Sequence, residues 1–244
     1  MDSSPPTPTA SRDVLGELAA ARQAIARLEE TIMDQRRTID ERDKTIEALA
    51  EHAARANTDE LTGLPTRRQL RYWWDDLGTD PASMIGAVML IDLNGLHSLN
   101  EQWGHDGGDK IIVRVAESIS ALTGDTHPIK FAARLGGDEF FAAIRRGSTD
   151  SETIEAASNA AQRIIDLVSE PLPVGHDEDG NVIQIQPAVS IGIRVGVDPQ
   201  LFLSMRQADV AMFDAKKAAH DADDGTGRYS ISIQFGPAEP LDPA

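Results

Sequence analysis

An unbroken heptad pattern runs through the first fifty residues and limits what this part of the chain can become. Apolar positions recur alternately four and three residues apart from Val14 to Ala53. The a positions hold Leu18, Ile25, Ile32, Ile39 and Ile46, and the d positions include Leu28, Leu49 and the polar exceptions Gln35 and Arg42. Isoleucine at a with leucine at d favours parallel two-stranded coiled coils, and polar core residues restrict register and partner choice. A single amphipathic helix packed on a domain, the alternative, would need a wider apolar stripe. We therefore predict a dimeric coiled-coil helix over residues 11–56.

The composition changes on both sides of this helix. Residues 1–10 are rich in Pro, Ser and Thr, which predicts a disordered N-terminus. From about residue 57 to 236, apolar strand-like runs alternate with amphipathic helical patterns, which predicts one α/β domain with helices covering a mixed sheet. Residues 237–244 are expected to form a tail. With 41% apolar residues in 244, the chain can build a substantial core.

The expected elements of this domain follow from apolar periodicity and from glycine and proline breaks. They are helices at 66–77, 96–102, 110–122, 150–169 and 201–219, strands at 84–92, 129–133, 140–144, 186–195 and 228–235, and turns at 104–109 and 175–181.

Net charge and cysteine content exclude several classes of function. A net charge of -17 argues against broad binding to nucleic acid or to anionic membranes, because both need a basic surface. With no cysteine there is no disulfide framework, no Cys-ligated zinc and no thiol nucleophile. The longest strongly apolar run, 84–91, is too short to span a bilayer, and the N-terminus does not resemble a signal peptide. A cytoplasmic protein is the expectation.

Two glycines followed at once by two acids, between apolar runs, mark the most distinctive short stretch. Gly136-Gly137 between strand-like segments predicts a hairpin turn, and Asp138 and Glu139 are expected to start the second strand on opposite faces. Alone, this stretch would be interpreted as a solvated acidic hairpin. Asp92 ends the most apolar strand, however, and burial would raise its pKa unless a cation or donor faced it. Such a grouping of carboxylates suits divalent cations that share substrate phosphates, although spacing alone is only suggestive.

At this point the chain resembles the GGDEF family in the order and spacing of its motifs. The matching segments are 59–68 (DELTGLPTRR), 91–94 (IDLN), Asn100, 104–109 (GHDGGD), 134–140 (RLGGDEF), 190–193 (SIGI) and 208–216 (ADVAMFDAK). They extend from 58 to about 229. The resemblance implies a fold like the polymerase palm and the class III nucleotidyl cyclases. It also implies diguanylate cyclase activity, which joins two GTP molecules into cyclic di-GMP with release of two pyrophosphates.

The resemblance also assigns expected roles to residues. Two Mg²⁺ or Mn²⁺ ions per active site would be held by Asp92, the Leu93 carbonyl, Asp138 and Glu139, with Asp138 helping to deprotonate the attacking 3′-hydroxyl. Asn100 and Asp109 would bind the guanine edge, with His105 against the same nucleotide. Lys216 would contact phosphate, with His97 and His220 at neighbouring phosphate positions. Each subunit would carry one GTP, so the site would form between two domains of a homodimer.

Some positions depart from the family pattern. His97 and His220 stand where the family usually has lysine and arginine, and Asn94 replaces the second acid of an Asp-x-Asp pair. Histidine is only partly protonated near neutral pH, so phosphate binding could be weaker or the chemistry slower. His127 and Lys130 replace the Arg-x-x-Asp pair of the family's product-inhibition site, so we expect no inhibitory site there.

Three functions remain open from the sequence. The first is an active cyclase dimerised by its coiled coil. The second is a catalytically weak or degenerate GTP-binding module whose coiled coil docks another protein. The third is a purely structural coiled-coil adaptor. The sequence does not indicate the input signal. One candidate input is the coiled coil of a partner protein.

Overall fold

The structure is a computed structural model that describes residues 9–176, 179–222 and 226–233, with the side chains of 9–15 and 47–56 left out. The chain divides into two compact units, Met1–Ala54 and Arg55–Ala244. The expected tail at 237–244 and most of the expected disordered N-terminus lie outside the described residues. None of the described helices is long and apolar enough to cross a membrane.

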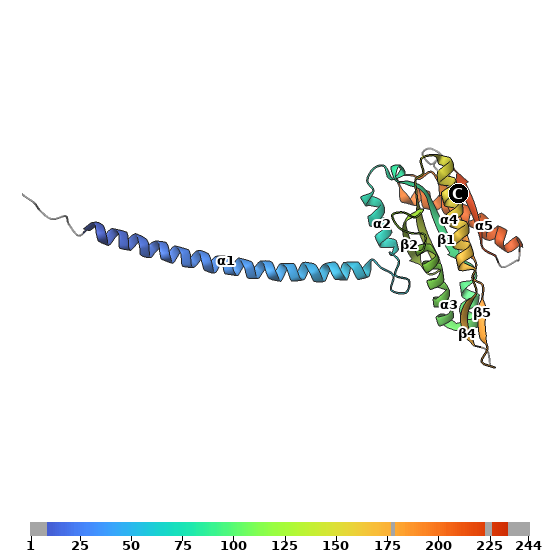
Figure 1. Cartoon of the computed structure of the whole chain (residues 1–244), viewed down its shortest axis with the longest axis horizontal. Helices are drawn as coiled ribbons and strands as arrows, with labels where there is room; N and C mark the ends of the chain where they lie inside the picture. Colours follow the sequence, from blue (N-terminus) through green and yellow to red (C-terminus); the bar gives the residue numbers. More distant parts are fainter. Residues whose placement is uncertain (1–8, 177–178, 223–225, 234–244) are drawn as a thin grey trace, which may run out of the picture. The chain divides into compact units, whose positions relative to one another are not determined.

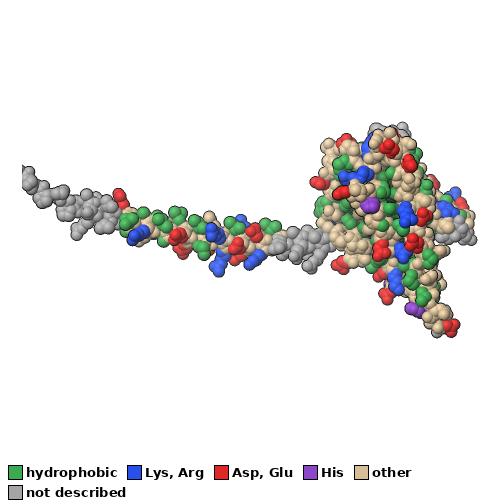
Figure 2. Space-filling model, viewed as in Figure 1, with side chains coloured by type: hydrophobic (Ala, Val, Ile, Leu, Met, Phe, Trp, Pro, Cys, Tyr) green, Lys and Arg blue, Asp and Glu red, His purple; other side chains and the backbone are tan. Residues whose placement is uncertain are grey.

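The described residues of the first unit belong to a single long helix, α1 (Thr9–Ala56), as the heptad pattern predicts (Figure 1). It already includes Thr9 and Ala10, which were expected to be disordered. The heptad side chains Leu18, Ile25, Leu28, Ile32, Ile39 and Ile46 are each 48% to 62% exposed. Figure 2 shows such hydrophobic side chains interspersed with charged ones along the helix. A regular apolar seam on a solvated helix is typical of a chain that pairs with another helix.

The second unit is built on a five-stranded mixed sheet with strand order β2-β3-β1-β6-β7. Its strands are β1 (Ile85–Leu93), β2 (Ile129–Gly136), β3 (Glu139–Arg145), β6 (Val189–Val195) and β7 (Arg228–Ile233). The central strand β1 pairs antiparallel with β3 and β6, and β7 lies parallel to β6. A separate hairpin joins β4 (Leu172–His176) to β5 (Val182–Ile185). The predicted α/β fold with a mixed sheet is confirmed.

Helices cover both faces of this sheet, and alternate residues of β1 supply the two cores (Figure 1). Met89 and Ile91 point to α3 (Leu96–Ser120) and α4 (Asp150–Val168). Val88 and Leu90 point to α2 (Arg67–Asp76) and α5 (Leu201–Ala222). Every residue of β1 is buried, which is why the sequence shows a continuous apolar run there instead of alternation. A short 3₁₀ turn, η1 (Pro81–Ser83), precedes β1.

The predicted glycine-rich turn at 104–109 is wrong in its extent. Only Gly104 leaves helical geometry, with φ 73° and ψ 174°, and α3 continues on both sides of this kink. Gly107 and Gly108 lie inside the helix, where a Cβ would come within 2.7 Å of the Trp103 Cβ and 1.9 Å of the Asn100 Oδ1, respectively. These glycines are therefore needed for the close approach of the two halves of α3, and they do not form an open loop.

Candidate active site

Asp92 occupies the end of the central strand and is the most buried acid of the site. It is 8% exposed, and its Cα partners are Glu139 on β3 and Ser190 on β6. The Lys216 ammonium lies 2.9 Å from its carboxylate. Burial raises the pKa of Asp92, Lys216 opposes this rise, and the negative charges of Asp138 and Glu139 add to it. The Asp92 carboxylate is thus buried beside one cation and within electrostatic reach of Asp138 and Glu139.

The hairpin turn brings the other two acids to the same end of the sheet. Gly136 and Gly137 have φ of 142° and 54°, which side-chain-bearing residues rarely adopt. Asp138 belongs to the turn and not to the strand, which begins at Glu139, so one part of the hairpin prediction was wrong. The Leu93 amide donates to the Asp138 carbonyl at 3.2 Å, which ties the turn to the end of β1.

Two arginines connect this turn to the start of α2 and to the segment before it. The Arg134 guanidinium donates twice to the Gly137 carbonyl, at 2.7 and 3.1 Å, and lies 2.9 Å from the Asp59 carboxylate. Arg67 donates to the Leu135 carbonyl at 3.2 Å and lies 3.5 Å from the Glu139 carboxylate. We call these contacts the hairpin clamp.

The partly buried ion pair of the clamp perturbs the pKa of Asp59. Burial alone raises the pKa of its carboxyl, but hydrogen bonds from Thr62 and Arg134 outweigh burial and hold the pKa below its ordinary value. The motifs at 59–68 and 134–140 were recognised in the sequence, yet no role was predicted for Asp59, Arg67 or Arg134. Their contacts join positions 68 to 75 residues apart, which no local pattern reveals.

The predicted guanine-binding residues all lie on α3. Asn100 stands before the kink, and its Oδ1 is buried without a hydrogen-bond partner among the described residues. A buried acceptor without a donor is costly, so this atom is suited to receive an N–H from a ligand. His105 and Asp109 are exposed on the second half of the helix. The kink at Gly104 therefore lies between Asn100, which has a buried acceptor, and Asp109, which is exposed.

The predicted phosphate-binding residues do not all meet. Lys216 and His220 lie one turn apart on α5 and line the same hollow of about 460 Å³, together with Asn94 and Gly95. His97 instead points to Glu101, with 3.3 Å between Nε2 and the carboxylate, and both side chains are well exposed. His97 does not line the hollow that contains Lys216 and His220.

Asn94, the departure from the Asp-x-Asp pattern, has a structural role. Its Oδ1 accepts a 2.8 Å hydrogen bond from the hydroxyl of Ser190, which is fully buried. The backbone N–H of Asn94 also donates to the Ala188 carbonyl at 2.8 Å. The side chain thus fixes the loop after β1 to the start of β6.

The donor chemistry of the site fits a hard divalent cation, since Asp92, Asp138 and Glu139 offer only carboxylate oxygens. In the described part of the chain, no three acidic or histidine side chains are already arranged as a metal-binding group. The carboxylates of Asp92 and Glu139 are instead paired with Lys216 and Arg67. A bound cation, together with these two basic side chains, would reduce the electrostatic repulsion between the acids.

Comparison with known proteins gives a consistent result for the globular unit. Residues 56–222 match the family described as diguanylate cyclase, GGDEF domain. The chain is 32% identical over 176 residues to the diguanylate cyclase DgcP of Escherichia coli, covering 70% of this chain and 48% of that protein. It is also 32% identical over 179 residues to the cyclic di-GMP phosphodiesterase PdeB of Shewanella oneidensis, covering 72% of this chain and 19% of that protein. The chain thus spans between a fifth and a half of these two relatives.

A solved structure shares the architecture of both units. The coiled coil and GGDEF domain of DgcB from Caulobacter crescentus, in complex with c-di-GMP, aligns with a TM-score of 0.62 and 24% identity. The alignment covers 85% of this chain and 99% of that one.

Proposed function

The chain belongs to the GGDEF-domain family of diguanylate cyclases, and from this premise we propose that it condenses two GTP into cyclic di-GMP and two pyrophosphates. The observation that carries the proposal is the convergence of Asp92, Asp138 and Glu139 at one end of the sheet, beside Lys216. We further propose that the protein acts in the cytoplasm as part of bacterial second-messenger signalling.

Two Mg²⁺ or Mn²⁺ ions held by Asp92, the Leu93 carbonyl, Asp138 and Glu139 would polarise the α-phosphate and acidify the 3′-hydroxyl. Asp138 is the group proposed to take the proton of that hydroxyl, because it stands at the tip of the turn, half-buried and fixed by its backbone. The hairpin clamp keeps the turn in place, and Lys216 opposes the rise in the pKa of Asp92 that burial causes.

Guanine recognition is assigned to Asn100 and Asp109, with His105 against the same nucleotide. The buried Asn100 Oδ1 can accept from the guanine amine, and Asp109 can accept from N1–H and N2. Adenine would leave these acceptors facing no matching donors, so the site should discriminate strongly in favour of GTP.

Phosphate binding is assigned to the hollow that contains Lys216 and His220. Gly95 precedes the N-terminus of α3 in that hollow, so the helix dipole adds favourable potential for an anion. His97 would have to leave Glu101 to take part.

The two halves of the reaction are proposed to meet in a homodimer formed by α1. Each domain would supply one GTP, and a parallel coiled coil raises the effective concentration of the second half-site. The exposed seam of α1 supports this pairing.

The test is incubation of the pure full-length protein with GTP and Mg²⁺ or Mn²⁺, followed by chromatographic identification of the product. Cyclic di-GMP is expected from the wild-type chain and none from Asp138→Ala. If neither metal supports product formation, the proposal fails.

A second candidate is a GTP-binding module without catalytic turnover, acting through its coiled coil on a partner protein. The direction of His97 favours it, because this imidazole faces Glu101 and does not line the hollow that holds Lys216 and His220. Isothermal titration distinguishes the two functions. Heat of GTP binding with no product would support the binding module, and turnover would exclude it.

A further inference from the structure

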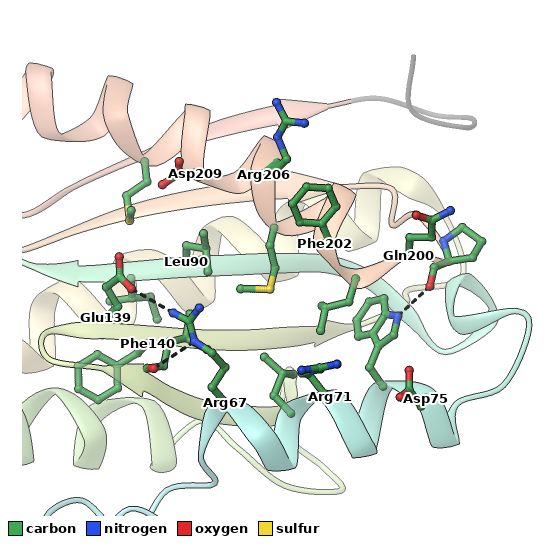
Figure 3. Close-up of a pocket in the computed structure, with 18 residues that line it drawn as sticks. Arg67, Arg71, Asp75, Leu90, Glu139, Phe140, Gln200, Phe202, Arg206 and Asp209 are labelled. Carbon is green, nitrogen blue, oxygen red and sulfur yellow. Dashed lines mark hydrogen bonds and ion pairs between the residues drawn. The ribbon is translucent and has the colours of Figure 1, made fainter. Parts of the chain in front are cut away.

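A pocket of about 680 Å³ opens between α2 and the first half of α5 (Figure 3). Asp92 instead contacts Lys216 in the second half of α5. This volume is typical of sites for small organic ligands. None of the proposed guanine or phosphate ligands lines it. Glu139 is the only proposed metal ligand that does.

The floor of the pocket is apolar and rigid. Leu70 and Trp74 from α2, Leu90 from β1 and Met212 from α5 are each at most 8% exposed. The Trp74 indole donates to the Pro199 carbonyl at 2.9 Å, which fixes the ring in the wall. At the rim, Phe202 is 61% exposed and can close over an apolar ligand.

Two arginines from successive turns of α2 stand on one wall of this pocket. Arg71 makes no hydrogen bond or ion pair with any described residue. Arg67 contacts Glu139 at 3.5 Å, with the two side chains 58% and 47% exposed. Ion pairs this long and this exposed are weak, so an anion can compete for Arg67. The guanidinium group of Arg206 lies over Phe202 and points away from the α2 wall.

The acids that line the pocket leave the space between the two arginines free. Asp75 lies at the outer end of α2, Asp209 lies on the opposite wall formed by α5, and Glu139 is the partner of Arg67 (Figure 3). A ligand lying on the apolar floor would therefore meet positive charge on the α2 side.

We propose that this pocket binds a small amphipathic anion, with an apolar body on the Leu70–Trp74–Met212 floor and a carboxylate or phosphate group between Arg67 and Arg71. The ligand's charge would draw Arg67 away from Glu139. Since Glu139 is a proposed metal ligand, this second part of the inference, a link between the pocket and the active site, rests on the proposed function. Binding itself does not.

The binding test uses decanoate as the probe, with decan-1-ol as its uncharged counterpart, in isothermal titrations of the full-length protein. Decanoate is expected to bind at least tenfold more tightly than the alcohol. Arg71→Gln should weaken decanoate binding about tenfold, since a charge-assisted contact is lost, and leave decan-1-ol unchanged. Arg163→Gln, an exposed arginine of α4 on the other face of the sheet, is the matched control and should change nothing.

Equal affinity for the acid and the alcohol, or an unchanged affinity in Arg71→Gln, would overturn the site. The link to the active site has its own readout. Glu139→Gln removes the group that competes for Arg67, so it should tighten decanoate binding two- to fivefold, whether or not the protein turns over GTP. No tightening would contradict the link.

Discussion

At the scale of single residues, Asp92 combines function with a cost to stability. Its pKa is raised mainly by burial, so the folded state binds a proton more readily than the unfolded state. Its contribution to stability is therefore greatest below the unfolded pKa of about 3.8 and is lost as pH rises through the folded pKa. At neutral pH the buried charge destabilises the fold, although Lys216 reduces the effect.

Asp92→Asn is accordingly expected to abolish cyclase activity while stabilising the protein at pH 7. A rise in melting temperature of about 2–4 °C, or ~1 kcal/mol, is the expected scale. Thermal unfolding at pH 7 and pH 4 checks this, and the gain should shrink at the lower pH. A variant less stable than wild type at pH 7 would show that the ion pair with Lys216 stabilises the protein by more than the burial of the Asp92 charge destabilises it.

The two histidines at the usual cation positions are not equivalent. His220 shares a hollow with Lys216, whereas His97 is directed to Glu101. His220→Arg is therefore expected to raise kcat/KM for GTP about tenfold, because one charge-assisted phosphate contact is gained. His97→Lys should raise it less, since a lysine there would still face Glu101. Steady-state kinetics decide this, and the opposite ranking would contradict the placement.

At the scale of elements, the hairpin clamp connects the start of the globular unit to the turn that carries Asp138. Arg134→Met removes the Asp59 ion pair and both bonds to the Gly137 carbonyl. We expect a loss of about 1–3 kcal/mol in the free energy of unfolding, measured by urea denaturation. Lys130→Met on the same strand is the control. Equal stability of the two variants would mean that the clamp is not structural.

The clamp also predicts a pH dependence. The pKa of Asp59 is lowered, so its stabilising contribution is present above about pH 3.8 and is lost as pH falls through the folded pKa. The difference between wild type and Arg134→Met should therefore be constant near neutrality and shrink in acid. A difference that grows below pH 3.8 would contradict this sign.

The kink of α3 gives a prediction about substrate binding. Gly108→Ala would place a Cβ 1.9 Å from the Asn100 Oδ1, so Asn100 must move. We expect the KM for GTP to rise about tenfold or more, with a smaller effect on kcat. Gly175→Ala is the matched control, because no atom lies within 4 Å of its added Cβ. An unchanged KM in Gly108→Ala would remove Asn100 from guanine recognition.

Sequence patterns predicted most of these elements because apolar periodicity, turn glycines and helix caps each depend on residues that are close together in the chain. The central strand that carries Asp92, the hairpin and the long first helix are confirmed, except that β1 ends at Leu93 and Asp138 stays in the turn. The kink of α3 was mistaken for an open turn because glycines required for close packing resemble turn glycines. The hairpin clamp, the Asn94–Ser190 bond and the Asp92–Lys216 pair were not predicted. Each joins residues far apart in the chain, and only the tertiary fold brings them together.

At the scale of the whole molecule, activity should depend on the helix α1. Replacing Ile32, a seam residue 48% exposed in the single chain, with lysine should shift the protein from dimer to monomer in light scattering. Turnover per chain should then fall at least tenfold at low protein concentration and recover as concentration rises. Replacing Met33, which lies outside the a and d positions, with lysine is the control. A monomeric Ile32→Lys variant with full turnover would exclude a shared site.

The central claim is that this chain makes cyclic di-GMP at the carboxylate cluster of Asp92, Asp138 and Glu139. The most direct measurement quantifies cyclic di-GMP and pyrophosphate together, after GTP and Mg²⁺ or Mn²⁺ are added to the purified protein. The account predicts two pyrophosphates for each cyclic di-GMP from the wild-type chain, and neither product from Asp138→Ala. Absence of cyclic di-GMP from a dimer that binds GTP, or equal yields from the two chains, would contradict it.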